Sequence, residues 1–284
     1  MLNKICVRLF GGLGNQLFIY AFGLANAQRS GKQLVIDDVS GFSHRDIYHA
    51  EFCLSAFSIT GAELSKSKYK YLVANRYFWF IAKKLGLSHV EKDESKYDAR
   101  SVNASSGFFE GYWQSYLYFH EYKALIKSNL RLRETNHPQI LSYKERILRS
   151  KNSVAIGMRF YDTFSGDAAI YDVKGTSYYS AAIKLLESKE KNLTYFVFSM
   201  NIAKAKKLLS QYVERDIVFV DPLEGLGNAQ VDLYLMTLCS HFVISNSTMY
   251  WWAAYLGAAD NSVVICPETG FSNKDALPPE WLKI

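Results

Sequence analysis

The amino-acid sequence predicts an α/β fold made of two Rossmann-like halves with parallel sheets. Short runs rich in β-branched and aromatic residues alternate with helical patterns, and this alternation occurs on both sides of a longer, aromatic-rich helical stretch. The composition agrees, because 49% of the 284 residues are hydrophobic and there are only 17 glycines and 5 prolines. Disordered, collagen-like and low-complexity classes are therefore excluded.

The first half opens with a strand, a helix and a second strand. Residues 5–10 have the pattern of a buried strand, residues 15–29 that of a helix, and residues 33–37 that of another strand. A strand–helix–strand opening is typical of a parallel sheet.

The second half repeats this alternation without a sequence repeat. We expect strands at residues 153–158, 194–198, 217–220, 242–245 and 262–266, with helices at residues 178–187, 202–212, 230–239 and 249–256. The boundary falls within residues 136–153, where His137-Pro138 ends one element and a charged helix leads to the next strand. The expected domains are residues 1–150, with a helical aromatic and basic insertion, and residues 151–284.

The cysteine pattern and the absence of targeting segments bear on location. The four cysteines are Cys6, Cys53, Cys239 and Cys266. They have no CxxC spacing and stand among apolar neighbours, which predicts free thiols in a reducing cytosol. The N-terminus lacks the pattern of a signal peptide, and no apolar run approaches the roughly 18 to 20 residues of a membrane span. We expect a cytoplasmic protein that is soluble or at most peripheral on the membrane.

Three glycines mark the turn between the first strand and the first helix. Gly11-Gly12-Leu13-Gly14-Asn15-Gln16 would let backbone N–H groups approach an anion at the start of a helix. The spacing is not that of the dinucleotide fingerprint, because Leu17 stands where the third glycine should be. A tight turn at the edge of a sheet is the alternative.

Two further segments at strand ends carry polar residues. Ser245-Asn246-Ser247-Thr248 follows an apolar strand and precedes a helix, so its hydroxyls and the helix N–H groups suit a diphosphate; ordinary helix capping explains one or two of these residues. Arg159 and Asp162 follow another strand. The arginine could pair with phosphate oxygens and the aspartate could orient it or accept a proton, whereas an exposed loop pair is the alternative. No DxD or HxxxH pattern is present, which predicts no metal site.

The glycine turn resembles the opening of bacterial α-1,2-fucosyltransferases of glycosyltransferase family 11. The resemblance continues in the family's order over residues 5–256, through five segments: Gly11 to Ala21, Gly111-Tyr112-Trp113-Gln114-Ser115, Tyr195 to Ser199, Asp232 to Met236, and Ser245 to Thr248 with Trp251-Trp252.

The resemblance implies a GT-B fold, with two Rossmann-like domains facing across a cleft. The N-terminal domain would serve the acceptor and the C-terminal domain would bind GDP-fucose. The implied reaction is inverting and metal-independent, needs no cofactor, and moves L-fucose to the 2-hydroxyl of a galactoside in a surface polysaccharide of the O-antigen type. The acceptor would be lipid-linked, at the cytoplasmic face of the inner membrane.

The resemblance also assigns roles to matching residues. Arg159 matches the first arginine of the family's HxRRxD motif, expected on the β-phosphate, and Asp162 its final aspartate, the candidate base. Donor contacts are expected from Gly12, Gly14, Asn15, Gln16, Arg159, Ser199, Asn246, Ser247 and Thr248. Acceptor contacts are expected from Tyr112, Trp113 and Gln114.

The sequence departs from the family pattern at several of these positions. The family's histidine is Gly157 here and its second arginine is Phe160, while Met200 and Asn201 replace the usual acidic pair. Three alternatives follow: another GDP-sugar donor, an altered acceptor specificity with the chemistry intact, or a weakened enzyme. A non-catalytic glycan- or nucleotide-binding protein is the alternative from another functional class. Because Arg159 and the Ser-Asn-Ser-Thr segment are present, we expect an active transferase.

The formal charge of +6 comes from one segment. Between Glu63 and Glu91 there is no acidic residue but there are six basic ones, which are Lys66, Lys68, Lys70, Arg76, Lys83 and Lys84. The rest of the chain has 27 basic and 27 acidic residues. Apolar residues in this segment recur at helical spacing, among them Tyr77, Phe80 and Ile81. Residues 66–84 are thus either an amphipathic helix packed on the N-terminal domain or an interfacial helix on anionic lipid. Nucleic acid is not an expected partner.

Overall fold

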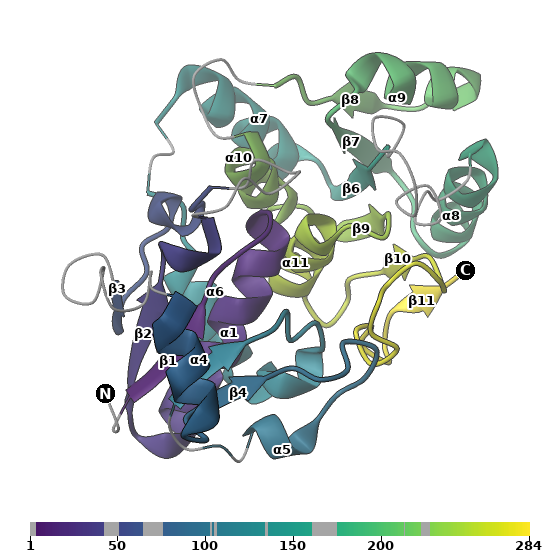
Figure 1. Ribbon diagram of the computed structural model, residues 1–284. Helices are drawn as coiled ribbons and strands as arrows, with labels where there is room; N and C mark the ends of the chain where they lie inside the picture. The colour runs from purple at the N-terminus through teal and green to yellow at the C-terminus, as the bar shows by residue number, and fades with distance from the viewer. Residues whose placement is uncertain are drawn as a thin grey trace. The chain divides into compact units, whose positions relative to one another are not determined.

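The computed structural model divides the chain into two compact units (Figure 1). Unit 1 comprises Met1–Arg133 and Ser272–Pro278, and unit 2 comprises Glu134–Phe271 and Pro279–Ile284. The structure describes residues 4–42, 51–64, 76–102, 104, 107–133, 136–160, 175–212, 214–222 and 228–284.

Unit 1 is built on a five-stranded sheet of order β3-β2-β1-β5-β4, in which every pair is parallel. Its strands are β1 (Lys4–Arg8), β2 (Gln33–Asp37), β3 (Ala62–Leu64), β4 (Ser88–Val90) and β5 (Gly107–Glu110). The strand–helix–strand opening predicted from the sequence is confirmed, because α1 (Leu13–Ser30) connects β1 to β2.

The described helices of unit 1 differ in how much of their surface is buried. Most residues of α1 are buried, which fits its apolar sequence, and the helix ends at Gly31, whose φ is +62°. The others are α4 (Arg76–Lys84), α5 (Ala99–Val102), α6 (Lys123–Asn129) and the 3₁₀ turns Ser40–Phe42, Leu54–Ala56, Tyr116–Tyr118 and His120–Tyr122.

Unit 2 is built on a six-stranded parallel sheet of order β11-β10-β9-β6-β7-β8. Each strand and helix expected in this half occurs, and β11 is an addition. The strands are β6 (Asn152–Met158), β7 (Leu193–Ser199), β8 (Ile217–Phe219), β9 (His241–Ile244), β10 (Val264–Cys266) and β11 (Leu282–Lys283). The helices are α7 (Pro138–Arg149), α8 (Gly175–Lys189), α9 (Ile202–Leu209), α10 (Asn228–Met236) and α11 (Thr248–Gly257), with a 3₁₀ turn at Ser210–Tyr212.

The units divide at residue 134, earlier than the expected boundary after residue 150. The cause is α7, which contacts elements of unit 2: the Tyr143 hydroxyl accepts from the Asp221 N–H at 3.1 Å, and Arg146 pairs with Asp216.

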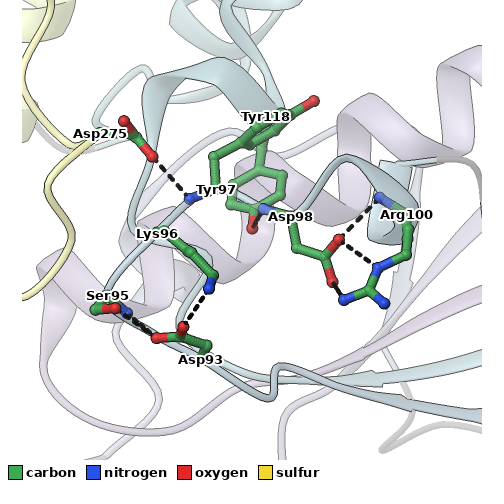
Figure 2. Close-up of polar contacts among 8 residues, drawn as sticks. All are labelled: Asp93, Ser95, Lys96, Tyr97, Asp98, Arg100, Tyr118 and Asp275. Atoms are coloured by element: carbon green, nitrogen blue, oxygen red, sulfur yellow. Dashed lines mark hydrogen bonds and ion pairs between the residues drawn. The ribbon is translucent and has the colours of Figure 1, made fainter.

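Residues 272–278 belong to unit 1 although they lie near the end of the chain. The Asp275 carboxylate accepts from the Tyr97 N–H at 3.0 Å, its carbonyl accepts from the Ser115 hydroxyl at 2.7 Å, and the Lys274 N–H donates to Ser95. Figure 2 shows Asp275 meeting the loop that carries Ser95 and Tyr97. Such a return of the chain has no local sequence signal.

The strand order reverses once in each sheet. In unit 1 this reversal lies between β1 and β5, and in unit 2 between β6 and β9. Open α/β sheets bind ligands beyond the carboxyl ends of their strands at such a reversal. The two edges of interest are therefore fixed by topology alone.

All four cysteines are free, as expected. Among the described residues, no helix has the length and apolar character that a membrane crossing requires.

Candidate functional site

The carboxyl ends of β6 and β9 bring two of the predicted segments together in unit 2. Gly157 of β6 is in register with Ile244 of β9, and the next residues are linked by backbone contacts. The Ser245 N–H donates to the Gly157 carbonyl at 3.1 Å, and the Arg159 N–H donates to the Ser245 hydroxyl at 3.3 Å. Arg159 therefore leaves the sheet beside the Ser245–Thr248 segment.

Helix α11 begins at this edge. Ser247 is its N-cap residue, but the Ser247 side chain makes no capping hydrogen bond, and the first intrahelical contact runs from the Trp251 N–H to the Ser247 carbonyl. The amides of Thr248 and Met249 thus face outward from the positive end of the helix dipole. Helix α11 is firmly anchored, because its residues from Tyr250 to Leu256 are buried. The backbone of Arg159 thus meets the segment that leads into α11, while its guanidinium contacts Met200 after β7. A guanidinium and a fixed helix N-terminus, which both suit a phosphate group, follow the carboxyl ends of neighbouring strands of one sheet.

Tyr250 occupies the space beside Gly157. A Cβ atom added at Gly157 would lie 2.5 Å from Cγ of Tyr250, whose ring is buried and whose hydroxyl donates to the Phe198 carbonyl at 3.1 Å. A histidine at position 157 has no room here. The departure at Gly157 is thus linked to a tyrosine 93 positions later in the sequence.

Lys204 lies over the ring of Phe160, the residue at the position of the family's second arginine. Its ammonium nitrogen is 4.5 Å from the ring centroid, within the range of a cation–π contact. Lys204 is held at the start of α9 because Asn201 caps that helix, with its side-chain oxygen accepting from the Lys204 N–H at 3.0 Å. The Arg159 guanidinium contacts the sulfur of Met200 on the same side of the sheet. Two cationic side chains therefore follow the ends of β6 and β7.

Several predicted donor residues use their polar groups internally. The Ser199 hydroxyl donates to the Met158 carbonyl at 2.9 Å and accepts from the Asn201 N–H at 3.1 Å. The Asn246 amide donates to the Gly270 carbonyl at 3.4 Å. These contacts give Ser199 and Asn246 a supporting place at the edge. Asp162 lies outside the described residues.

The reversal in unit 1 joins the glycine turn to the loop after β5. Gly11 has a φ of +70°, and Gly12 precedes the first residue of α1 in an extended conformation. Asn15 in the first turn of α1 accepts from the Gln114 amide at 3.0 Å. A positive helix end, Asn15 and Gln114 thus share this edge.

Gln16 is a structural residue of this edge. Its side-chain amide donates to the carbonyls of Gly11 and Glu51, both at 2.8 Å, and its oxygen accepts from the Cys53 N–H at 2.9 Å. Both amide hydrogens are used, so Gln16 fastens the segment at residues 51–53 to the glycine turn. Asp37 is committed in a similar way to the N–H groups of Val39 and Ser40.

The expectation that Trp113 contacts the acceptor is wrong, because its ring belongs to the core. Trp113 is fully buried and stacks on Phe22 with ring centroids 4.1 Å apart. Its φ of +55° is unusual for a bulky residue and turns the ring inward. Tyr112, which packs on Phe10, and Gln114 are partly exposed, and their contact with the acceptor stays a prediction.

Glu91, which follows β4, holds this unusual turn and was not identified from the sequence. Its Oε2 atom accepts from the N–H groups of Tyr112 and Trp113 at 2.7 and 3.0 Å, while Oε1 is buried without a hydrogen-bond partner. Burial raises the pKa of Glu91 to about 7, although the two N–H contacts act in the opposite direction. A glutamate after a short edge strand has no recognisable sequence signature.

Comparison with known proteins identifies the family. The family model described as glycosyl transferase family 11 matches residues 4–284. This chain belongs to glycosyltransferase family 11. An α-1,2-colitosyltransferase of Escherichia coli is 30% identical over 100% of this chain and 99% of its own length. The O-antigen biosynthesis glycosyltransferase WbnK of Escherichia coli is 27% identical over 97% of this chain and 99% of its own.

Solved structures place this family 11 glycosyltransferase in the GT-B fold class. Arabidopsis thaliana FUT1 in complex with GDP has a TM-score of 0.55 at 16% identity and covers 95% of this chain and 72% of its own. POFUT1 in complex with GDP-fucose has a TM-score of 0.52 at 13% identity, with 93% and 99% covered. The fucosyltransferase NodZ from Bradyrhizobium has a TM-score of 0.51 at 18% identity, with 88% and 91% covered.

No group of three His, Cys, Asp or Glu side chains that could hold a metal ion occurs in the part of this glycosyltransferase that the structure describes. Metal-independent transfer remains a prediction, to be tested by chelation.

The stability of the protein should depend on the protonation of Glu91. The folded state keeps the proton up to about pH 7, whereas the unfolded chain loses it near pH 4.5, so the free energy of unfolding should fall between these values. Glu91→Gln keeps an oxygen for both N–H groups and should remove this part of the pH dependence. Thermal unfolding from pH 4 to 8 measures it, with Glu145→Gln on the exposed side of α7 as the control.

Burial also raises the pKa of Asp232 to about 7. The difference in unfolding free energy between the Glu91→Gln variant and the wild type removes the contribution of Asp232, which both proteins share. A Glu91→Gln profile parallel to that of the wild type would contradict the assignment.

The close contact between Gly157 and Tyr250 predicts a loss of stability when any side chain is added. Gly157→Ala should lower the free energy of unfolding by roughly 1 to 3 kcal/mol, the usual cost of overpacking a core, and Gly157→His should lower it further. Denaturant titration measures both. Gly12→Ser is the control, because nothing lies within 4 Å of a Cβ at Gly12 and serine suits an N-cap. Wild-type stability of Gly157→Ala would show that the ring moves freely.

Proposed function

We propose that this chain is an inverting α-1,2-glycosyltransferase that takes L-fucose, or the closely related colitose, from its GDP-sugar. The acceptor is the 2-hydroxyl of a galactoside in a polysaccharide of the O-antigen type. The observation that carries the proposal is the hydrogen bond from the Arg159 backbone to Ser245, which joins the end of β6 to the segment leading into α11 at the strand reversal of unit 2. This edge suits the diphosphate of a nucleotide sugar.

The relatives support the kind of sugar and linkage. The α-1,2-colitosyltransferase matches this chain from end to end, and WbnK is named for O-antigen biosynthesis. Colitose differs from fucose by the loss of one ring hydroxyl, so a single pocket can be close to complementary to both. A lipid-linked acceptor at the cytoplasmic face of the inner membrane is the setting in which an O-antigen transferase would act.

The proposed reaction is a direct displacement at the anomeric carbon. The bond from C1 to the acceptor oxygen forms while the bond from C1 to the β-phosphate oxygen breaks, and the electron pair of that bond goes to the phosphate. Arg159 and the amides of Thr248 and Met249 would stabilise the growing negative charge. The amides of Gly14 and Asn15 would offer the same kind of contact in unit 1. The acceptor proton passes to a base, for which Asp162 is the candidate.

We assign to Lys204 the positive charge that Phe160 does not supply. The Lys204 ammonium contacts the ring of Phe160, which directly follows Arg159 after the end of β6. Asn201 caps α9 without adding a negative charge, so the field of Lys204 is not cancelled by its neighbour. The site would then keep two cations for a diphosphate.

A donor panel tests the function. The purified protein is incubated with a galactose-terminated oligosaccharide and with GDP-fucose, GDP-colitose or GDP-mannose, and products are identified by mass and by linkage analysis. We expect α-1,2-linked product from GDP-fucose, GDP-colitose or both, at a rate that EDTA leaves unchanged. Product from GDP-mannose alone would refute the donor class. Saturable binding of all donors without product would identify a non-catalytic binding protein, and dependence on Mn²⁺ would refute metal independence.

Removing either cation should lower transfer. Arg159→Ala should lower kcat/KM by an amount that corresponds to on the order of 2 to 4 kcal/mol of transition-state stabilisation, as for the loss of one donor to a developing oxyanion. Lys204→Met should also lower kcat/KM. Lys206→Met is the matched control, because Lys206 lies on the same helix over the ring of Phe219. Activity of Arg159→Ala within threefold of wild type, or equal effects of the two lysine variants, would overturn the respective assignment.

A further inference from the structure

Helix α4 presents an apolar face to solvent. Tyr77, Phe80 and Ile81 are 72%, 65% and 53% exposed, and Leu85, just after the helix, is 67% exposed. Their spacing puts them on one side of the helix. Of the two alternatives for this segment, packing of the stripe on the N-terminal domain does not hold for Tyr77, Phe80 and Ile81. Residues 66–75 of the segment lie outside the described residues.

The opposite side of α4 is fixed to the sheet of unit 1 (Figure 1). Ala82 is buried in a cluster with Cys6, Val35 and Phe108. The helix ends in a Schellman motif, in which Gly86 has a φ of +68° and the N–H groups of Gly86 and Leu87 donate to the carbonyls of Lys83 and Ala82.

Leu87 then packs on the same cluster as Ala82. Ala82 and the helix end fix the rotation of α4, and the side chains of Tyr77, Phe80 and Ile81 point away from the core. The exposed stripe is a property of the folded unit and not of a frayed helix.

Basic side chains accompany the apolar face. Lys83 and Lys84 are exposed at the end of α4, and Lys84 stands one turn after Phe80 on the apolar side. The sequence from residue 64 to residue 90 contains no acidic residue. Aromatic and aliphatic groups with lysines beside them are the composition of helices that lie in a membrane interface. Lysines reach the headgroups while their aliphatic stems stay in apolar surroundings.

We infer that α4 is a docking surface for anionic lipid. A membrane accepts both components of the face, because acyl chains take the side chains of Phe80, Ile81 and Leu85 while phosphate headgroups take Lys83 and Lys84. A second copy of the chain would fit poorly, because a symmetric contact brings like charges together. The inference rests on α4 alone, and the lipid-linked acceptor of the proposed function would give the contact its purpose.

Vesicle co-sedimentation of the full chain tests the inference. We expect binding to vesicles of phosphatidylethanolamine with phosphatidylglycerol, little binding to phosphatidylcholine, and weaker binding as salt rises. Phe80→Ser with Ile81→Ser should weaken binding at least about tenfold. Lys83→Gln with Lys84→Gln should do the same, since each lysine near an anionic surface contributes about fivefold.

The controls separate lipid contact from general hydrophobicity and from catalysis. Leu148→Ser removes a side chain that is 60% exposed on α7 and should leave vesicle binding unchanged. The α4 variants should retain wild-type transfer to a soluble acceptor, so a failure of this inference is distinguishable from a failure of the proposed function. Wild-type vesicle binding by both double variants would overturn the inference. An absence of vesicle binding by the wild type would also overturn it. If light scattering then shows a dimer that the α4 variants lack, the face is a contact between copies of the chain.

Discussion

The parallel pairing of the strands is the constraint on which both candidate edges depend. Every pair in the two sheets is parallel, so each chain segment must cross over to the opposite end before the next strand begins. The carboxyl ends of the strands consequently share one edge, and helices α1 and α11 begin there with their positive ends. The strand reversals then select β1 with β5 and β6 with β9. An anion site follows from connectivity before any side chain is considered.

The polar residues at these edges divide according to whether their hydrogen-bonding capacity is already used. The side chains of Gln16 and Ser199 form hydrogen bonds to neighbouring backbone groups, and Glu91 accepts from two consecutive N–H groups of the loop after β5. Such residues cannot leave their partners without exposing buried donors or acceptors, which costs about 1 to 3 kcal/mol for each group. They make the edges rigid. In the proposed function, Arg159 and the helix amides would contact the ligand, and the rigid surroundings would hold them in place before it binds.

The sequence predicted the parallel α/β architecture because hydrophobic periodicity is local. It marked polar turns at several strand ends, but which of these turns meet depends on the strand order. It missed the division at residue 134 and the return of residues 272–278, which depend on contacts between distant segments. The resemblance assigned Trp113 to the acceptor, because a matching segment does not reveal a φ of +55° or the stacking of the ring on Phe22. For α4, periodicity found the stripe but not its direction, which the small side chain of Ala82 decides.

The departures from the family pattern are coupled changes within one packed edge. At Gly157 the missing side chain leaves a space that the Tyr250 ring fills, with its hydroxyl bonded to the Phe198 carbonyl. At Phe160 the missing guanidinium is accompanied by Lys204, which Asn201 positions at the start of α9. Any stable fold fills such a space, because a cavity lowers stability, so the packing at Gly157 follows from folding alone. The cation is the part that bears on function, because a diphosphate needs positive charge and Lys204 supplies it from a neighbouring element.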